Sequence, residues 1–256
     1  MPEFCEVCER AAREAGAVLQ EWRGRFAVRE KGPADLVTEA DLAAQKKIRG
    51  LITEKFPGHL FMGEEDDGAQ QPADDSPYRW VVDPLDGTTN YVHGLPHYAV
   101  SIALEYEETP VVAGIYDPVK DEYFHASRGG GAFLGDEPIR ASGVATLEQA
   151  VFAAGFAPNV QPGSPEIERF LRVLYASQSV RRLGSAALNL AYVACGRLDG
   201  YWAMSVKRWD VAAGCLLVSE AEGVLTDIGG GPVNLARPQL LAAGSAALHE
   251  ATRELF

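Results

Sequence analysis

Two aspartates that follow a short apolar run have the types and spacing that point most directly to chemistry. Asp83 and Asp86 come after residues 80–82, whose β-favouring side chains predict a strand that ends at Pro84. Residues 87–89, Gly-Thr-Thr, then offer N–H groups and hydroxyls. Carboxylates at a strand end hold a hard cation through oxygen, while the N–H groups of a turn or helix start hold a phosphate. An isolated Asp-x-x-Asp more often forms a turn or caps a helix, so this interpretation needs further motifs.

Two more acidic motifs stand on either side of this run. Residues 63–65 (Gly-Glu-Glu) follow a short predicted strand at 59–62, and residues 209–214 (Trp-Asp-Val-Ala-Ala-Gly) lie in the second half. Ligands gather at strand ends, which places Glu64 well for catalysis, although a solvated acidic loop would look the same. By itself, Asp210 would be read as an N-cap or first-turn acid of a helix.

Together, the three motifs resemble the signature of the inositol monophosphatase family, whose core pattern Asp-Pro-Ile/Leu-Asp-Gly-Thr matches residues 83–88. The resemblance covers the chain from Lys31 to about Pro232. It implies an α+β fold, a layered α-β-α-β-α sandwich of the inositol monophosphatase/fructose-bisphosphatase type. It also implies hydrolysis of a small phosphorylated cyclitol or sugar by a water molecule that Mg²⁺ activates, with sensitivity to lithium.

The resemblance assigns a metal site in which every ligand is an oxygen atom. Glu64, Asp83 and the Leu85 carbonyl would hold one Mg²⁺, while Asp83, Asp86 and Asp210 would hold a second. A weaker third ion would face Glu64 through water, which gives two or three ions in the site. Because the set contains no His or Cys, it suits Mg²⁺ or Mn²⁺.

The same resemblance assigns catalytic roles around the phosphate. Glu64 and Thr88 would orient the attacking water, and Asp83 would bridge two ions. The backbone N–H groups of Gly87 and Thr88 would hold the phosphate oxygens.

A loop and helix start upstream would lie over the metal site. The resemblance places Lys31 and Asp41 close to the waters of the third ion. Local sequence gives another role, because Thr38-x-x-Asp41 predicts a capping box at a helix start. The two roles of Asp41 are compatible.

The leaving-group side is where the sequence departs from the family pattern. The resemblance gives contacts with the sugar or cyclitol to Asp86, Asp210 and a short segment made of Gly184, Ser185 and Ala186. The position of the glutamate that usually binds the hydroxyls is occupied by Ala203. Fructose 1,6-bisphosphate, histidinol phosphate and 3′-phosphorylated nucleotides therefore remain alternatives to inositol phosphate, as does a metal-binding regulatory protein without turnover. Lys207 and Arg208 either read a second phosphate or are solvated bases near a helix start.

Composition limits the class of protein. The chain has 256 residues, 47% hydrophobic and 23% charged, with a formal net charge of −13. This length and composition suit one large domain or two closely packed lobes. We expect an N-terminal α+β lobe over 1–142 and a C-terminal α/β lobe over 143–256, packed as one compact unit. The absence of a basic stripe disfavours nucleic acid, and the absence of a long apolar run or signal peptide predicts a cytoplasmic protein without a membrane span. The family resemblance implies a homodimer.

Four cysteines do not make a metal or redox site. Cys5 and Cys8 form a Cys-x-x-Cys, but Cys195 and Cys215 are widely spaced, with no nearby histidine. We therefore expect reduced, mostly buried thiols.

Periodicity and turn residues predict the elements. Helices are expected at 3–23, 38–56, 166–177, 186–196, 210–222 and 246–255. Strands are expected at 98–106, 111–116, 122–126, 150–154, 199–204, 224–227 and 239–242, the first three as an antiparallel meander. Residues 31–38 and 68–78 are predicted loops, and the glycine runs at 129–131 and 229–231 are predicted turns.

Overall fold

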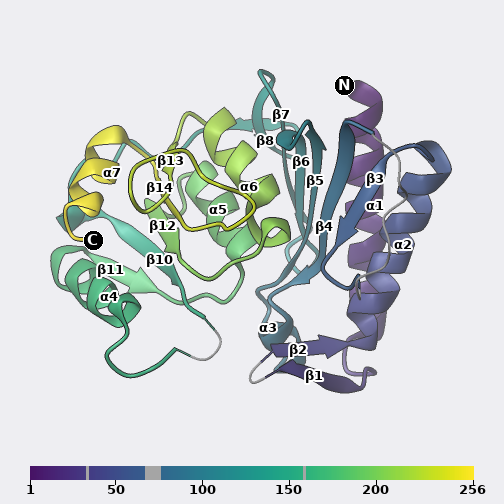
Figure 1. Cartoon of the computed structure of the whole chain (residues 1–256), viewed down its shortest axis with the longest axis horizontal. Coiled ribbons are helices and arrows are strands. Elements are labelled where there is room, and N and C mark those ends of the chain that lie inside the picture. The colour runs from purple at the N-terminus through teal and green to yellow at the C-terminus, as the bar shows by residue number, and fades with distance from the viewer. Residues whose placement is uncertain (33–34, 67–75, 158–159) are drawn as a thin grey trace.

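The protein forms five stacked layers of helices and sheets (Figure 1). The structure is a computed structural model that describes residues 1–32, 35–66, 76–157 and 160–256, and the side chains outside residues 30–36. Two sheets alternate with three pairs of helices. The helices are α1 (Pro2–Trp22) with α2 (Glu39–Lys55), α5 (Ala186–Ala194) with α6 (Arg208–Glu220), and α4 (Pro165–Ala176) with α7 (Ala246–Arg253). The expected α-β-α-β-α sandwich is confirmed.

The larger sheet carries the aspartate motif. Its strands, in spatial order, are β3 (Leu60–Gly63), β4 (Tyr78–Asp86), β5 (Ala99–Tyr106), β6 (Thr109–Asp117), β7 (Glu122–Ser127), β8 (Gly131–Leu134) and β9 (Glu137–Ile139). β3 pairs in parallel with β4, and all other pairs are antiparallel, which confirms the predicted meander. Because β3 and β4 are parallel, their carboxyl ends meet at one edge, and the acids that follow them are brought together.

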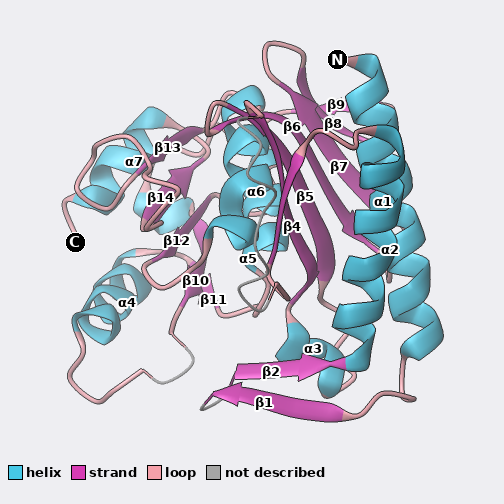
Figure 2. Cartoon of the chain, turned by 45° about the vertical axis from the view of Figure 1, so that its right-hand side comes forward, coloured by secondary structure: helices cyan, strands magenta, loops and turns pink. Residues whose placement is uncertain are grey.

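The smaller sheet closes the other side of the middle helices (Figure 2). Its spatial order is β11 (Ser179–Arg181), β10 (Val151–Gly155), β12 (Gly200–Ala203), β14 (Leu240–Ala243) and β13 (Val224–Thr226). β10 runs parallel to β11 and β12, whereas β14 is antiparallel to both of its neighbours.

Small side chains let the layers approach closely. The buried stripe of α1 consists of Cys8, Ala11, Ala12, Ala15, Gly16 and Leu19, which packs α1 against α2 and the large sheet. The largest apolar cluster is formed by the inner faces of both sheets with α5 and α6 between them. All four cysteines are free; Cys8 and Cys215 are buried, the other two are half-buried, and burial raises the pKa of Cys8 to about 12. The division into lobes at residue 142 stays a prediction.

Two predictions about the chain path are wrong. Residues 31–38, expected as a loop, contribute to an antiparallel ribbon of β1 (Val28–Gly32) and β2 (Asp35–Thr38). The strand expected to end at Pro84 instead continues to Asp86. There, Asp83 pairs with Ser101 and Asp86 with Ala99, so two residues of β4 lie opposite one residue of β5. This β-bulge tolerates Pro84 because the ladder is already interrupted there.

Several short elements carry too little local signal to be predicted. They are α3 (Thr88–Val92), β8, β9, β11 and the 3₁₀ turn Leu147–Gln149. In the described part of the chain, no helix is long and apolar enough to cross a membrane.

Candidate active site

The first pair of acids sits at the adjoining ends of β3 and β4. Glu64 directly follows β3, and its N–H donates to the Val82 carbonyl of β4 at 3.0 Å. Asp83 is only 2% exposed, and one of its carboxylate oxygens accepts a hydrogen bond from the Leu85 N–H at 2.9 Å. The bulge in β4 therefore turns the chain back over Asp83 and fixes that carboxylate.

Asp86 joins this edge of the large sheet to the start of α5. Its Oδ2 atom accepts from the Ser185 hydroxyl at 2.5 Å and from the Ala187 N–H at 2.7 Å. Ser185 is also the N-cap of α5 and accepts from the Leu188 N–H at 3.2 Å. The expected segment 184–186 therefore lies against Asp86, because a helix start satisfies its free N–H groups with the carboxylate.

Asp210 lies in the first turn of α6, as its sequence context predicts. Its Oδ2 atom accepts from the Lys207 N–H at 2.7 Å, which closes the first turn. Burial raises the pKa of Asp210 well above its usual value, and the charge of Asp86, which lies across the site, raises it further.

The four acids form one electrostatic cluster. The pKa of Asp83 is raised well above its ordinary value by burial first, and then by the charges of Glu64, Asp86 and Asp210. Burial also raises the pKa of Asp86 to about 6, against the hydrogen bonds from Ser185 and Ala187. Like charges at close range destabilise one another, so a cation at their centre would relieve the repulsion.

The donor set fits a hard divalent cation by its chemistry. The groups are carboxylates together with the Leu85 carbonyl. Burial and the charges of Glu64, Asp86 and Asp210 raise the pKa of Asp83, which is the electrostatic condition that a cation reverses. As the side chains stand, the described residues contain no group of three acidic, histidine or cysteine side chains arranged to hold an ion.

Thr88 connects the bulge to the start of α2. Its hydroxyl lies 3.1 Å from the Leu85 carbonyl oxygen and 3.4 Å from Oδ1 of Asp41. The capping box at Thr38 and Asp41 is confirmed, and burial raises the pKa of Asp41 to about 6 although Thr38 donates to it. Lys31 belongs to β1, but its side chain lies outside the described residues.

Gly87 makes the turn between the bulge and α3. Its φ of 101° is left-handed, and an added Cβ would lie 3.1 Å from the His97 carbonyl oxygen and 3.3 Å from that of Gly184. Only glycine meets both conditions without strain. The following N–H groups begin a short helix, where such groups lack partners within the helix.

A cleft of about 470 Å³ opens from Asp86 and Asp210 toward the smaller sheet. Besides Gly184, Ser185 and Ala186, its wall includes Asn189, Tyr201 and Arg182, which sequence reasoning missed. Asn189 lies one helical turn after Ser185 on α5, a spacing that could have pointed to it.

Asn189, which lines this cleft, carries a buried acceptor atom without a partner. The residue is 2% exposed, and among the described residues its Oδ1 atom has no hydrogen-bond partner. Tyr201 is a neighbour of Asn189. Burial raises the pKa of the Tyr201 hydroxyl, and a hydrogen bond with the Asn189 side chain partly offsets this rise.

Ala203 does not line the cleft. It is fully buried on β12, and its Cβ lies 2.9 Å from the place that a Cβ on Gly155 would take. Gly155 does line the cleft, so Ala203 lies directly behind its wall.

Arg208 is not free to read a second phosphate. Its guanidinium is paired with the buried carboxylate of Glu105 at 2.7 Å, and its side chain is only 11% exposed. Of the two bases, only Lys207 is exposed.

Comparison with known proteins identifies the family. The model of the inositol monophosphatase family matches residues 2–256. The chain belongs to the inositol monophosphatase family. It is 39% identical over 252 residues to the Nus factor SuhB of Pseudomonas aeruginosa, covering 96% of this chain and 93% of that protein. It is 42% identical over 228 residues to the inositol-1-monophosphatase of Rhizobium meliloti, covering 88% and 84%.

Solved structures of the family share the fold. The extragenic suppressor protein suhB of Bartonella henselae has a TM-score of 0.93 and 39% identity, covering 99% of this chain and 98% of that one. The inositol monophosphatase of Anabaena has a TM-score of 0.89 and 37% identity, covering 99% and 95%.

Proposed function

We propose that this protein is a Mg²⁺-dependent phosphate monoester hydrolase that acts on a small phosphorylated cyclitol or sugar. The observation that carries this proposal is the cluster of Glu64, Asp83, Asp86 and Asp210, in which burial and the neighbouring carboxylates raise the pKa of each of the three aspartates. Membership of the inositol monophosphatase family supports it.

Each residue takes a distinct part in the proposed site. Glu64, Asp83, Asp86, Asp210 and the Leu85 carbonyl would hold two or three Mg²⁺ ions. When bound, these ions supply positive charge to the phosphoryl group and lower the pKa of the attacking water. The Thr88 hydroxyl and Glu64 would orient that water, and Asp41 would hold Thr88 in place. The Gly87 and Thr88 N–H groups would hold the phosphate oxygens.

The leaving group would lie in the cleft beyond Asp86. Asp86, Asp210 and residues 184–186 face this space, as does Asn189. Relatives named inositol-1-monophosphatase favour an inositol phosphate. Because Ala203 supplies no carboxylate to read hydroxyls, we propose that Oδ1 of Asn189 accepts one of them. Arg182 also lines the cleft, and its positive charge would suit a sugar that carries a second anionic group, as in fructose 1,6-bisphosphate.

The remaining expectations extend this proposal. We infer inhibition by Li⁺, which would compete for the place formed by Asp83, Asp86 and Asp210. We also propose that the protein is a homodimer and that it acts in the cytoplasm. Some relatives are named Nus factor, but the net charge of −13 disfavours direct contact with nucleic acid in this chain.

A panel of phosphate esters tests the proposed function. The full chain, freed of metal and then given Mg²⁺, is assayed for inorganic phosphate with inositol 1-phosphate, fructose 1,6-bisphosphate, histidinol phosphate, a 3′-phosphorylated nucleotide and an aryl phosphate. We expect Mg²⁺-dependent release with a preference for a polyhydroxylated leaving group. No release from any ester with Mg²⁺ or Mn²⁺ would overturn the proposal.

A further inference from the structure

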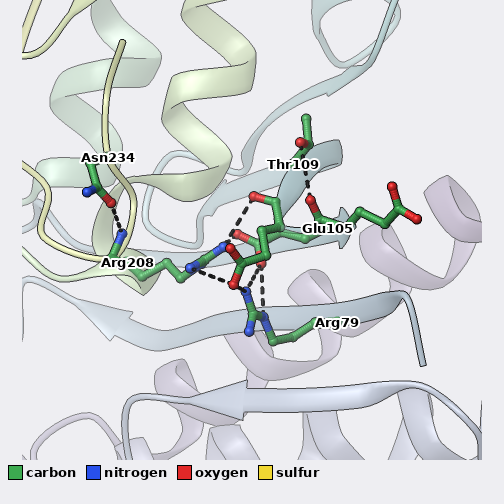
Figure 3. A network of polar contacts seen from close by, with 8 residues as sticks. Arg79, Glu105, Thr109, Arg208 and Asn234 are labelled. Atoms are coloured by element: carbon green, nitrogen blue, oxygen red, sulfur yellow. Dashed lines mark hydrogen bonds and ion pairs between the residues drawn. The ribbon is translucent and has the colours of Figure 1, made fainter. Parts of the chain in front are cut away.

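A fully buried carboxylate on β5 joins two arginines from different layers (Figure 3). Glu105 has no exposed surface. Its Oε2 atom accepts from Nε and Nη2 of Arg79 at 3.0 and 2.8 Å, and its Oε1 atom accepts from Nε of Arg208 at 2.7 Å. Each oxygen thus serves one arginine, and the carboxylate bridges them.

The two arginines belong to the elements that carry the proposed metal ligands. Arg79 lies on β4 ahead of Asp83 and Asp86, and Arg208 lies in the first turn of α6 beside Asp210. A second contact also ties β5 to α6: the hydroxyl of Ser101, the residue that pairs with Asp83, donates to the Trp209 carbonyl at 3.3 Å. β5 therefore holds the strand and the helix that must keep their acids in register.

The adjoining turn completes this network. Glu107 and Glu108 connect β5 to β6 with φ of 47° and 63°, a left-handed conformation that is unfavourable for glutamate. The Glu108 carbonyl accepts from Arg208 at 3.2 Å, and its carboxylate lies 3.4 Å from Arg79. Both arginines are thus held from two sides, which restricts the rotation of their side chains.

The network is better suited to fixing geometry than to adding stability. The desolvation of a buried ion pair largely cancels its Coulomb attraction, so such pairs contribute little net free energy of folding. Their directional contacts still fix which groups face each other. At this site, fixed geometry is needed because the acids of β4 and α6 repel each other when both are charged.

We propose that Glu105 is a positioning residue of the metal site, which holds Asp210 of α6 against Asp83 and Asp86 of β4 through Arg208 and Arg79. Without this bridge, mutual repulsion of the acids would move the start of α6 away from β4. The carboxylates would then need additional free energy to converge on a cation, and cation affinity would fall. The inference rests on the proposed function, because it assumes that these acids bind a divalent cation.

Glu105→Gln tests the bridge with a readout other than activity. The neutral amide cannot accept charge-assisted hydrogen bonds from both arginines. Titration calorimetry with Mn²⁺ or Mg²⁺ alone, on the metal-free full chain, should show roughly tenfold weaker binding, which is the size of effect expected when groups that orient ligands are changed. Phosphate release should need a correspondingly higher Mg²⁺ concentration, while kcat at saturating Mg²⁺ stays close to that of the wild type.

Glu122→Gln is the matched control. Glu122 lies on β7 of the same sheet, and its two carboxylate oxygens accept from Nη1 and Nη2 of Arg197 at 2.6 and 2.5 Å. Arg197 follows α5 in the chain. Neither partner belongs to an element with a proposed metal ligand. Its cation affinity should stay within about twofold of the wild type, even where its melting temperature falls.

The outcomes separate the two proposals. Cation binding by Glu105→Gln within about threefold of the wild type, or an equal loss in Glu122→Gln, would overturn the positioning role. Should Glu105→Gln fail to fold, Arg208→Lys keeps the charge without the fork, and weaker binding in that variant supports the role while unchanged binding overturns it. A wild type that neither binds the cation nor releases phosphate would instead overturn the proposed function.

Discussion

Asp83 illustrates how the site works against the stability of the fold. It is almost completely buried, and burial together with three neighbouring carboxylates raises its pKa. A carboxyl whose pKa is higher in the folded than in the unfolded state destabilises the fold wherever it is ionised. That penalty disappears as the pH falls through the folded pKa toward the unfolded value.

Asp83→Asn is therefore expected to abolish Mg²⁺-dependent phosphate release while stabilising the metal-free protein. Removing one charge relieves repulsion worth on the order of 1 kcal/mol, which corresponds to a rise of about 2–4 °C in melting temperature for a chain of this size. The rise should be larger near about pH 8 than near about pH 5, because the cluster is partly protonated at the lower pH. Calorimetry in a chelator, together with phosphate assays, checks both parts. Near-normal turnover at saturating Mg²⁺ would contradict the bridging role.

The proposed contact between Asn189 and a hydroxyl of the leaving group can be tested by substitution. Asn189→Leu removes the unpartnered acceptor with little change in volume. A net hydrogen bond contributes about 0.5–1.5 kcal/mol, so kcat/KM for the best polyhydroxylated ester should fall by roughly 2- to 10-fold. An aryl phosphate, which offers no hydroxyl to Asn189, serves as the control and should be hydrolysed as before. An equal loss with both esters would place Asn189 outside the leaving-group contacts.

Among the elements, the bulged strand β4 and the starts of α5 and α6 determine the site. The bulge directs Asp83 and Asp86 to one edge of the sheet. The start of α5 donates hydrogen bonds to Asp86, and the first turn of α6 contains Asp210. Strain also appears at this scale, in the hairpin between β5 and β6. Its two turn residues, Glu107 and Glu108, take the positive φ angles for which asparagine and glycine are better suited.

Glu107→Asn should stabilise the hairpin by about 0.5–1 kcal/mol, since asparagine tolerates the left-handed region better than glutamate. Glu107 is exposed, so no packing is lost. Glu108→Asn is the matched comparison and should gain less, because it loses the contact with Arg79. Chemical denaturation of the three proteins measures the difference. A larger gain for Glu108→Asn would show that its carboxylate does not contribute to the network.

At the scale of the whole molecule, the middle layer joins the two sheets. α5 and α6 contribute to the largest apolar cluster, which includes residues from both sheets. The cleft is likewise lined from both, by Asp86 of β4 and by Tyr201 of β12. The proposed site therefore exists only when both halves of the chain are folded together.

Thermal unfolding should accordingly show a single transition. The proposed lobes, 1–142 and 143–256, share a core, so neither can lose its structure without exposing apolar surface of the other. Calorimetric and van't Hoff enthalpies should agree, and circular dichroism and tryptophan fluorescence should give the same midpoint. Two resolved transitions would show that the lobes fold independently.

The acids, the order of their motifs and most of the regular elements could be predicted from local sequence patterns. Helix periodicity, the capping box at Thr38 and the antiparallel meander are predictions from local patterns that the structure confirms. The sequence by itself did not determine the ribbon of β1 and β2 or the continuation of β4 past Pro84, because pairing between strands overrides local turn signals.

The residues that meet around these acids could not be predicted, because they come from distant elements that pack together. Asn189 and Tyr201 reach the cleft from α5 and β12, and no local pattern marks Tyr201. Arg208 looked like a base next to a motif, yet it is held by Glu105, more than a hundred residues earlier in the chain. A sequence shows which side chains can carry charge. Which charges face each other depends on the packing of distant elements, and that packing also sets their pKa values and their partners.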